Sequence, residues 1–440
     1  MALGDWTTTF ETLPADSENA GLGDDRIRTL KGEIRTRGAV EMNFGDSTFD
    51  ATYGDTGRLL PGAARIYRAT GALPTTLQKP DGTAQSGTLG AADTGRLVLD
   101  QRGWQDALQM WDGALATPAW VGIGRRLNLI RNGGMRFDQR RAGAAATITA
   151  GTRTKVLDGW QITVTGSSAA TCQQVTAGLP TSAVSKYGAK IVGAASVSAV
   201  DYGQRIEARD TTQWGGYVSL RVGWIYVDGA AGTITPSLRI DTPAAADDWT
   251  TPTNRLAQAF TAAAGGFFTH TFDLSALTNY ANGAQVYIRF SGASDLDANT
   301  KSVVITDWDI TPGQAANRQF QLEDYQVEYD RVRRYYQKTF NAATAPAQNA
   351  GLAGSLVMTG DDSNTTAFQW QHSPPMRTTP TITTYNPSAA ATTPVNGSDG
   401  SSGTLSTVQG GEQVTYIRFD ASGATRETDY HIHAAADAEL

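Results

Sequence analysis

Between residues 159 and 308 the chain contains nine short segments in which apolar and polar residues alternate. Gly, Asp or Asn interrupts the chain between neighbouring segments. A period of two places alternate side chains on opposite faces of an extended backbone, so each segment predicts a strand with one buried face. Nine such strands in one stretch predict an antiparallel sandwich, in the form of a jelly roll. The segments are 159–164, 190–192, 202–207, 216–222, 224–227, 233–240, 267–272, 285–290 and 302–308.

The sequence as a whole predicts a mostly β protein built of four parts. Residues 1–40 hold a polar attachment segment and one short helix, and residues 41–126 read as a small β-domain or stalk of short strands broken by turns. Residues 127–340 form the expected jelly roll, which a short helical piece at 330–338 closes. Residues 341–440 begin with an Ala- and Pro-rich linker and then repeat the strand-and-turn pattern, which predicts a second, smaller β-sandwich.

The helix expected near the start has an apolar stripe formed by Ile27, Leu30 and Ile34, and Asp24 or Asp25 can cap it. A helix this short is marginal in water on its own. Either a globular neighbour covers the stripe, or identical copies bundle around a symmetry axis through these three residues.

Charge, cysteine content and the N-terminus exclude several classes of protein. The chain has 36 Lys and Arg against 43 Asp and Glu and no basic block, so nucleic acid is not an expected partner. The single cysteine, Cys172, leaves neither a disulfide framework nor a cysteine zinc site. No signal peptide and no run of about 18 apolar residues is evident, so we expect synthesis in a cytoplasm and no contact with a membrane.

Candidate ligand contacts are aromatic rings that lie in or beside polar loops. Sugar recognition needs flat aromatic faces together with planar hydrogen-bonding groups. Trp214 and Trp249 meet this description, and Tyr202 and Tyr280 are further exposed candidates. Asp210, shortly before Trp214, is a candidate polar contact. The competing interpretation is that each ring fills the sandwich core. Three other tryptophans lie inside apolar strands and are expected in the core: Trp160, Trp224 and Trp308.

Two clusters have a spacing that suits metal ligands, and each also has a simpler explanation. Asp295, Asp297 and Asn299 alternate as in a calcium loop, but the segment lacks the glycine and distant glutamate of an EF-hand, which favours a solvated turn. His431 and His433 share one face of a predicted strand and could ring a metal on a three-fold axis. Two surface histidines that flank a core Ile432 explain the pattern more simply.

Nothing in the sequence predicts catalysis. Glycoside hydrolysis needs two carboxylates placed across a sugar, and no spacing pairs the available acidic residues. A nucleophile elbow and a phosphate-binding glycine loop with lysine are both missing. We therefore expect no enzyme and no cofactor. The carboxylates considered are Glu207, Asp210, Asp228 and Asp307.

Five sets of short sequence segments, in chain order, resemble parts of phage fibre proteins. They correspond to an attachment segment, a stalk module, the opening of a jelly-roll domain, the end of that domain and a C-terminal domain. The five sets are Trp6 with 24–31; 92–100 with 111–113 and 120–122; 128–140 with 158–160; 320–323 with 333–338; and 375–380 with 436–440.

This resemblance extends to tail fibres, head fibres and the head spikes of gene transfer agents. It implies a homotrimer that is fixed to other particle proteins through its N-terminal segment and lies on the surface of a phage or phage-like particle. The jelly roll would be similar to carbohydrate-binding modules and would mediate adsorption to bacterial surface polysaccharide. The alternative is a structural connector or decoration that carries another receptor-binding protein, and a depolymerase is the third reading.

Overall fold

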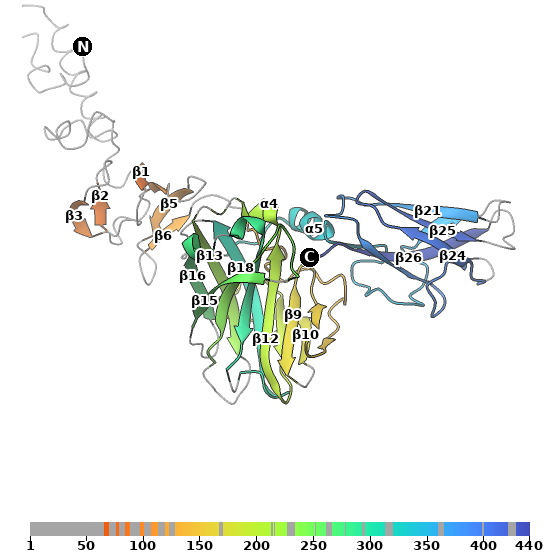
Figure 1. The fold of residues 1–440 in the computed structure, drawn as a ribbon, viewed down its shortest axis with the longest axis horizontal. Coiled ribbons are helices and arrows are strands. Elements are labelled where there is room, and N and C mark those ends of the chain that lie inside the picture. The colour runs from red at the N-terminus through yellow and green to blue at the C-terminus, as the bar shows by residue number, and fades with distance from the viewer. Residues whose placement is uncertain are drawn as a thin grey trace, which may run out of the picture. The chain divides into compact units, whose positions relative to one another are not determined.

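The computed structural model describes six strands between residues 66 and 122 and most of residues 128–440 (Figure 1). The gaps are 167–169, 213, 215, 227–233, 251, 261–265, 278, 293–294, 313–319, 360–364, 398–399 and 421–427. The expected helix with Ile27, Leu30 and Ile34 lies outside the described residues. Two compact units are formed, one with residues 1–126 and 313–319 and the other with residues 127–312 and 320–440.

The first unit contains a four-stranded sheet and a hairpin. The sheet has the order β1-β4-β5-β6, with β1 and β4 parallel and the other neighbours antiparallel. Strands β2 and β3 pair with each other in antiparallel fashion. The strands are β1 (Ile66–Ala69), β2 (Thr76–Gln78), β3 (Ala84–Thr88), β4 (Leu97–Asp100), β5 (Ala107–Asp112) and β6 (Ala119–Gly122).

Two six-stranded antiparallel sheets form the predicted sandwich. Their orders are β16-β13-β18-β11-β10-β7 and β15-β14-β17-β12-β9-β8. From β11 to β18 nearly every connection crosses from one sheet to the other, as in a jelly roll. The strands are β7 (Ala146–Ile148), β8 (Arg153–Lys155), β9 (Gln161–Gly166), β10 (Ala170–Val175), β11 (Gly188–Val192), β12 (Val197–Ile206), β13 (Tyr217–Tyr226), β14 (Ser237–Pro243), β15 (Pro252–Ala259), β16 (Gly266–Asp273), β17 (Ala284–Phe290) and β18 (Ser302–Pro312).

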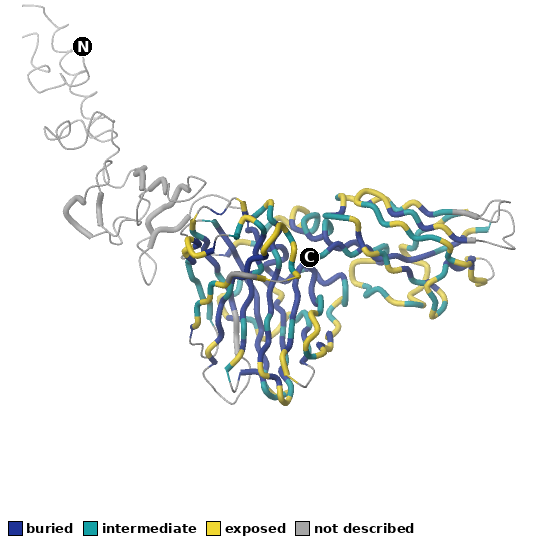
Figure 2. Tube along the Cα trace, viewed as in Figure 1, coloured by how far each residue is buried: buried dark blue, intermediate teal, exposed yellow. Residues whose placement is uncertain are grey.

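The core of the sandwich lies between the two sheets and follows the alternation seen in the sequence (Figure 2). Trp160 and Trp308 are fully buried in it, which confirms their prediction as core residues. The Trp160 ring stacks on Tyr202 with centroids 5.0 Å apart and meets Trp308 edge-on at 5.2 Å. Cys172 is also buried there, and burial raises the pKa of its thiol. The antiparallel sandwich predicted from period-two patterning is thus confirmed.

The sandwich is followed by a helix and a strand where the sequence predicted one helical piece at 330–338. Helix α5 (Tyr325–Arg333) begins earlier, because Asp324 caps it by accepting hydrogen bonds from the N–H groups of Gln326 and Val327. The C-terminal part of the predicted helical piece is instead strand β19 (Tyr336–Lys338), which pairs with β26. Pairing with a distant strand overrides the local helical pattern here. No described helix is long and apolar enough to cross a membrane.

The remaining strands form the smaller C-terminal β-structure. In one sheet β19, β20, β22 and β23 all pair with β26, and in the other the order is β21-β25-β24. Phe368, Phe419, Tyr430 and Ile432 are core residues between them. The strands are β20 (Leu356–Thr359), β21 (Thr365–Gln371), β22 (Thr381–Tyr385), β23 (Val395–Asn396), β24 (Thr404–Gln409), β25 (Val414–Asp420) and β26 (Asp429–Asp437).

Candidate functional site

Two of the five side chains that the sequence proposed as ligand contacts are buried. Trp214 and Tyr202 are each 0% exposed and belong to the sandwich core. Tyr202 points inward from β12, and its hydroxyl lies 3.4 Å from Sδ of Met135. Trp214 follows the short helix α4 (Ala208–Thr211) and enters the same core. The prediction that these rings are exposed is wrong. Tyr202 occupies an inward position of β12, and the polar residues around Trp214 do not determine which way its ring points.

The other three proposed contacts are accessible in part. Trp249 is half-buried, and the guanidinium carbon of Arg205 lies 4.8 Å from the centroid of its ring system. Asp210 lies in α4 and forms an ion pair with Arg209 at 3.4 Å. Tyr280 is partly buried and packs against the core rather than standing free. A ligand role for Trp249 remains a prediction, and its contact with Arg205 places it beside the sheet face described next.

The outer face of the sheet β15-β14-β17-β12-β9-β8 carries many polar and charged side chains. In β12, Val200, Tyr202 and Ile206 are core residues, so Asp201 and Arg205 point away from the core. The strand register continues these positions into neighbouring strands. The outward-facing partners are Thr163 and Arg289 beside Asp201, Gln161 and Tyr287 beside Gly203, Gln285 beside Arg205, and Arg239, Asp241 and Arg255 further along.

Cations outnumber carboxylates on this face. Two arginines are paired with the two carboxylates of the face, Arg289 with Asp201 at 2.8 Å and Arg255 with Asp241 at 2.8 Å. The hydrogen bond to Asp241 raises the pKa of Arg255. The six cationic side chains of the face are Arg153, Lys155, Arg205, Arg239, Arg255 and Arg289.

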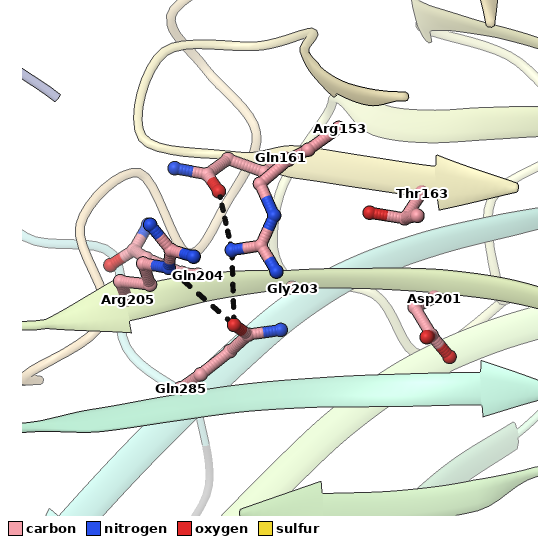
Figure 3. A pocket seen from close by; sticks show the side chains of 8 residues that line it. All are labelled: Arg153, Gln161, Thr163, Asp201, Gly203, Gln204, Arg205 and Gln285. Carbon is pink, nitrogen blue, oxygen red and sulfur yellow. Dashed lines mark hydrogen bonds between the residues drawn. The ribbon is translucent and has the colours of Figure 1, made fainter. Parts of the chain in front are cut away.

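A surface hollow opens in the middle of this face, around Gly203 (Figure 3). A Cβ atom at this glycine would lie 2.2 Å from the carbonyl oxygen of Val286 and 2.3 Å from Cβ of Tyr287, so only glycine allows the strands to approach this closely. Arginine and carboxamide side chains surround the gap. The hollow is lined by Arg153, Gln161, Thr163, Asp201, Gly203, Gln204, Arg205 and Gln285.

The carboxylates considered for catalysis have structural partners where they are described. Glu207 accepts hydrogen bonds from Arg334 and from the Tyr335 hydroxyl, and these lower its pKa although burial opposes them. Asp307 is buried, which raises its pKa, and it accepts hydrogen bonds from the N–H groups of Val184 and Ser185 at 2.6 and 3.0 Å. Asp228 lies outside the described residues. These contacts give Glu207 and Asp307 structural roles that require no catalytic function.

The two histidines of β26 are held within the chain. Nδ1 of His433 lies 2.9 Å from the Thr339 hydroxyl, and its Nε2 lies 3.0 Å from the carbonyl oxygen of Gly351. His433 is buried, so the expectation of two surface histidines is wrong for this residue. Nδ1 of His431 lies 3.0 Å from the Ser355 hydroxyl. In this chain the hydrogen bonds of His433 occupy both ring nitrogens that a metal would use.

The Asp295–Asn299 segment is stabilised by its own neighbours. Asp295 accepts a hydrogen bond from the N–H of Gly292 at 2.8 Å and is buried, and Asp297 pairs with Lys301 at 2.6 Å. Within the described part of the chain, no group of three or more His, Cys, Asp or Glu residues is placed to hold a metal ion.

Sequence reasoning missed Arg153, Arg205 and Gln285, which converge on the hollow. Arg205 and Gln285 both lie in segments that the sequence predicts as strands. The available signal was the polar half of each alternating pattern, which holds Arg, Asp and Gln where exposed strands often carry Thr or Ser. Which polar positions meet depends on strand order, and the sequence does not show it.

Comparisons with known proteins give similarity at the level of fold only. No protein-family model matches the chain, and no curated protein matches it. Among solved structures, it is similar to the enzymatically active domain of bacteriophage CBA120 tailspike protein 4, with 14% identity over 42% of this chain and 21% of that one and a TM-score of 0.29. The chain therefore spans about a fifth of that tailspike structure.

Two further similar structures are smaller domains. The family 11 carbohydrate-binding module from Clostridium thermocellum is 8% identical over 38% of this chain and 96% of its own, with a TM-score of 0.25. The K1 cleaved adhesin domain of Lys-gingipain from Porphyromonas gingivalis is 14% identical over 39% and 99%, with a TM-score of 0.24. At these values the similarity carries no conclusion about ligand or activity.

Proposed function

We propose that this chain is a non-enzymatic adhesin whose jelly roll binds bacterial surface polysaccharide. The observation that carries the proposal is the hollow around Gly203, where planar guanidinium and carboxamide groups converge on an open, polar sheet face. Such groups form paired hydrogen bonds with neighbouring hydroxyls of a sugar. A shallow site on a strand scaffold suits a polymer that passes across the face.

Trp249 supplies an aromatic surface at one end of the same face. Its ring is half-buried and lies against Arg205, which itself lines the hollow. An aromatic ring beside planar polar groups is the combination that binds the apolar face and the hydroxyl edge of one sugar. This arrangement supports a binding role for Trp249 in place of the buried Trp214 and Tyr202.

The particle setting of the adhesin rests on the resemblance to phage fibre proteins. In this proposal residues 1–40 attach the chain to other proteins of a phage or phage-like particle, and three copies assemble with their β-domains outward. Several weak sites on one particle raise avidity by about 10²–10⁴-fold without new contacts, so a shallow single site suffices for adsorption.

A pull-down on candidate host cells tests the proposal. We expect the purified full chain to bind cells that carry their capsular polysaccharide and to lose binding to capsule-free mutants. Gln285→Ala should weaken binding, because the Gln285 carboxamide lies between two arginines of the hollow. Gln369→Ala, at an exposed position of β21, is the matched control and should bind like the parent chain.

The other readings give different results in the same assay. Equal absence of binding to both cell types would overturn the adhesin and favour a connector whose partner is another particle protein. Release of soluble saccharide from purified capsule would instead indicate a depolymerase. Retained binding by Gln285→Ala would place the site on another surface of the molecule.

A further inference from the structure

Two arginines in the hollow share a single neutral acceptor. Nη1 of Arg153 lies 3.1 Å from Oε1 of Gln285, and Nε of Arg205 lies 3.5 Å from the same oxygen (Figure 3). Arg153 also donates to Oε1 of Gln161 at 3.3 Å. The guanidinium groups come from β8 and β12, with β9 between them in the sheet. Their acceptors in the hollow are therefore uncharged carboxamide oxygens.

Three of the four other cations of the same face form ion pairs, whereas Arg239 donates to the Ser237 hydroxyl. Lys155 pairs with Asp437 at 2.8 Å, and Arg289 and Arg255 each pair with an aspartate of the face. Among the ion pairs formed by the described residues, neither Arg153 nor Arg205 takes part. Burial, followed by the charge of Arg153, lowers the pKa of Arg205 to about 9. Two like charges thus lie close together without an ion pair of their own, and Asp201, the carboxylate of the hollow, is paired with Arg289.

We propose that this hollow binds an anionic group of a glycan, so that the ligand is an acidic polysaccharide bearing carboxylate or phosphate groups. The inference rests on the proposed function. Guanidinium groups match carboxylate and phosphate oxygens in paired hydrogen bonds, and such charge-assisted bonds are about twice as strong as those to a neutral oxygen. An anion between Arg153 and Arg205 also offsets their mutual repulsion.

The net charge of the whole chain does not favour binding of an acidic polymer, so any preference for one must come from the cations of this sheet face. The formal net charge is −7, so a polyanion gains no general attraction to the molecule. Binding of an acidic polymer must then depend on the few cations of this sheet face, and changing two of them should have a large effect. Since the site is partly exposed, salt should weaken the attraction.

The test uses surface polysaccharide extracted from cells that the protein binds, immobilised for biolayer interferometry with the full chain. One sample is untreated, one has its carboxylates reduced to alcohols, and one has its phosphates removed with hydrofluoric acid. We expect a loss of about tenfold or more in affinity after one of the two treatments, the scale of one charge-assisted hydrogen bond. The treatment that causes the loss identifies the anion.

Arg153→Gln and Arg205→Gln should each weaken binding to untreated polysaccharide by a similar factor. On the sample whose treatment weakens binding of the parent chain, the two substitutions should have little further effect, because the interaction that they remove is already absent. Arg418→Gln changes the same charge at an exposed position of β25 and should bind like the parent chain. Thermal unfolding of each variant checks that the fold is retained.

The outcomes separate this inference from the proposed function. Equal binding to all three samples would overturn the acidic ligand and leave the adhesin intact. Binding to none of them would overturn the adhesin itself. Displacement of the protein from the polysaccharide by single-stranded DNA at equal phosphate concentration would show a general polyanion site and would also overturn the inference.

Discussion

Nη1 of Arg140 lies 2.8 Å from Oδ2 of Asp437, which joins the beginning of the sandwich to the end of the last strand. The same guanidinium group lies 3.5 Å from Glu439 and 4.0 Å from Asp158. Lys155 reaches the other carboxylate oxygen of Asp437 at 2.8 Å. Three carboxylates therefore surround one largely buried arginine, and β26 is tied to the sandwich through that group.

Replacing Arg140 should destabilise the unit that contains the sandwich and β26. Arg140→Gln leaves the buried carboxylate of Glu439 without its cation, and breaking a buried ion pair in this way costs about 3–5 kcal/mol. Urea unfolding measures the effect. Arg333→Gln removes a more exposed arginine, 4.0 Å from Asp330, and should cost less than about 1 kcal/mol. Similar losses in both variants would show that the Arg140 cluster has no special role.

Titration of Asp158 should contribute to the pH dependence of the free energy of unfolding. Burial raises the pKa of this carboxyl from its ordinary value of 3.8 to about 7. Between those values the folded chain holds a proton that the unfolded chain has lost, so this group makes stability fall as pH rises, by at most about 1.4 kcal/mol per pH unit. Comparing Asp158→Asn with the parent chain from pH 4 to pH 8 should show that slope removed. An unchanged slope would contradict the assignment.

Asp437 should act in the opposite direction and at lower pH. Arg140 is the main cause that holds its pKa at about 2, against the effect of burial. The unfolded carboxyl titrates near its ordinary value of 3.8, so the stability from Asp437 is fully present above that pH and is lost as pH falls towards 2. Acid unfolding of Asp437→Asn should start from a lower stability at neutral pH and decline less between pH 4 and pH 2.

Replacing Trp214 should mainly reduce stability, whereas replacing Trp249 should mainly reduce binding. Trp214→Ala opens a cavity in the core and should cost about 3–5 kcal/mol of stability. Trp249→Ala removes a half-buried ring beside Arg205 and should mainly weaken binding to capsulated cells. Thermal unfolding and the cell pull-down, performed on both variants, measure the two effects. The reverse result, with binding lost only on removal of Trp214, would refute the placement of the site.

Assembly should depend on the N-terminal stripe. We expect the full chain to be a trimer by light scattering, and Leu30→Asp to shift it towards smaller species because a charge enters the predicted apolar seam. Thr29→Asp, one residue off the stripe, should leave the mass unchanged. A monomeric parent chain would refute the fibre architecture, and a Leu30→Asp trimer would place the assembly contacts elsewhere.

The alternating segments were sufficient to predict the sandwich, because period-two patterning directly reports which face of a strand is buried. Trp160 and Trp308 were predicted correctly for the same reason, since both sit at apolar positions of such strands. Local patterning failed at 336–338, where pairing with β26 turns a predicted helix end into a strand. It also failed at Trp214, whose polar neighbours gave no sign that the ring turns inward.

By itself, then, the sequence determined the β class, the sandwich and the absence of a cysteine framework, since all three follow from residue type and local spacing. Only the tertiary structure decided which polar residues meet. Arg153, Arg205 and Gln285 converge because β9 and β12 bring their strands together in one sheet, and strand order is a long-range property. The candidate site lies in that convergence, which no single segment encodes.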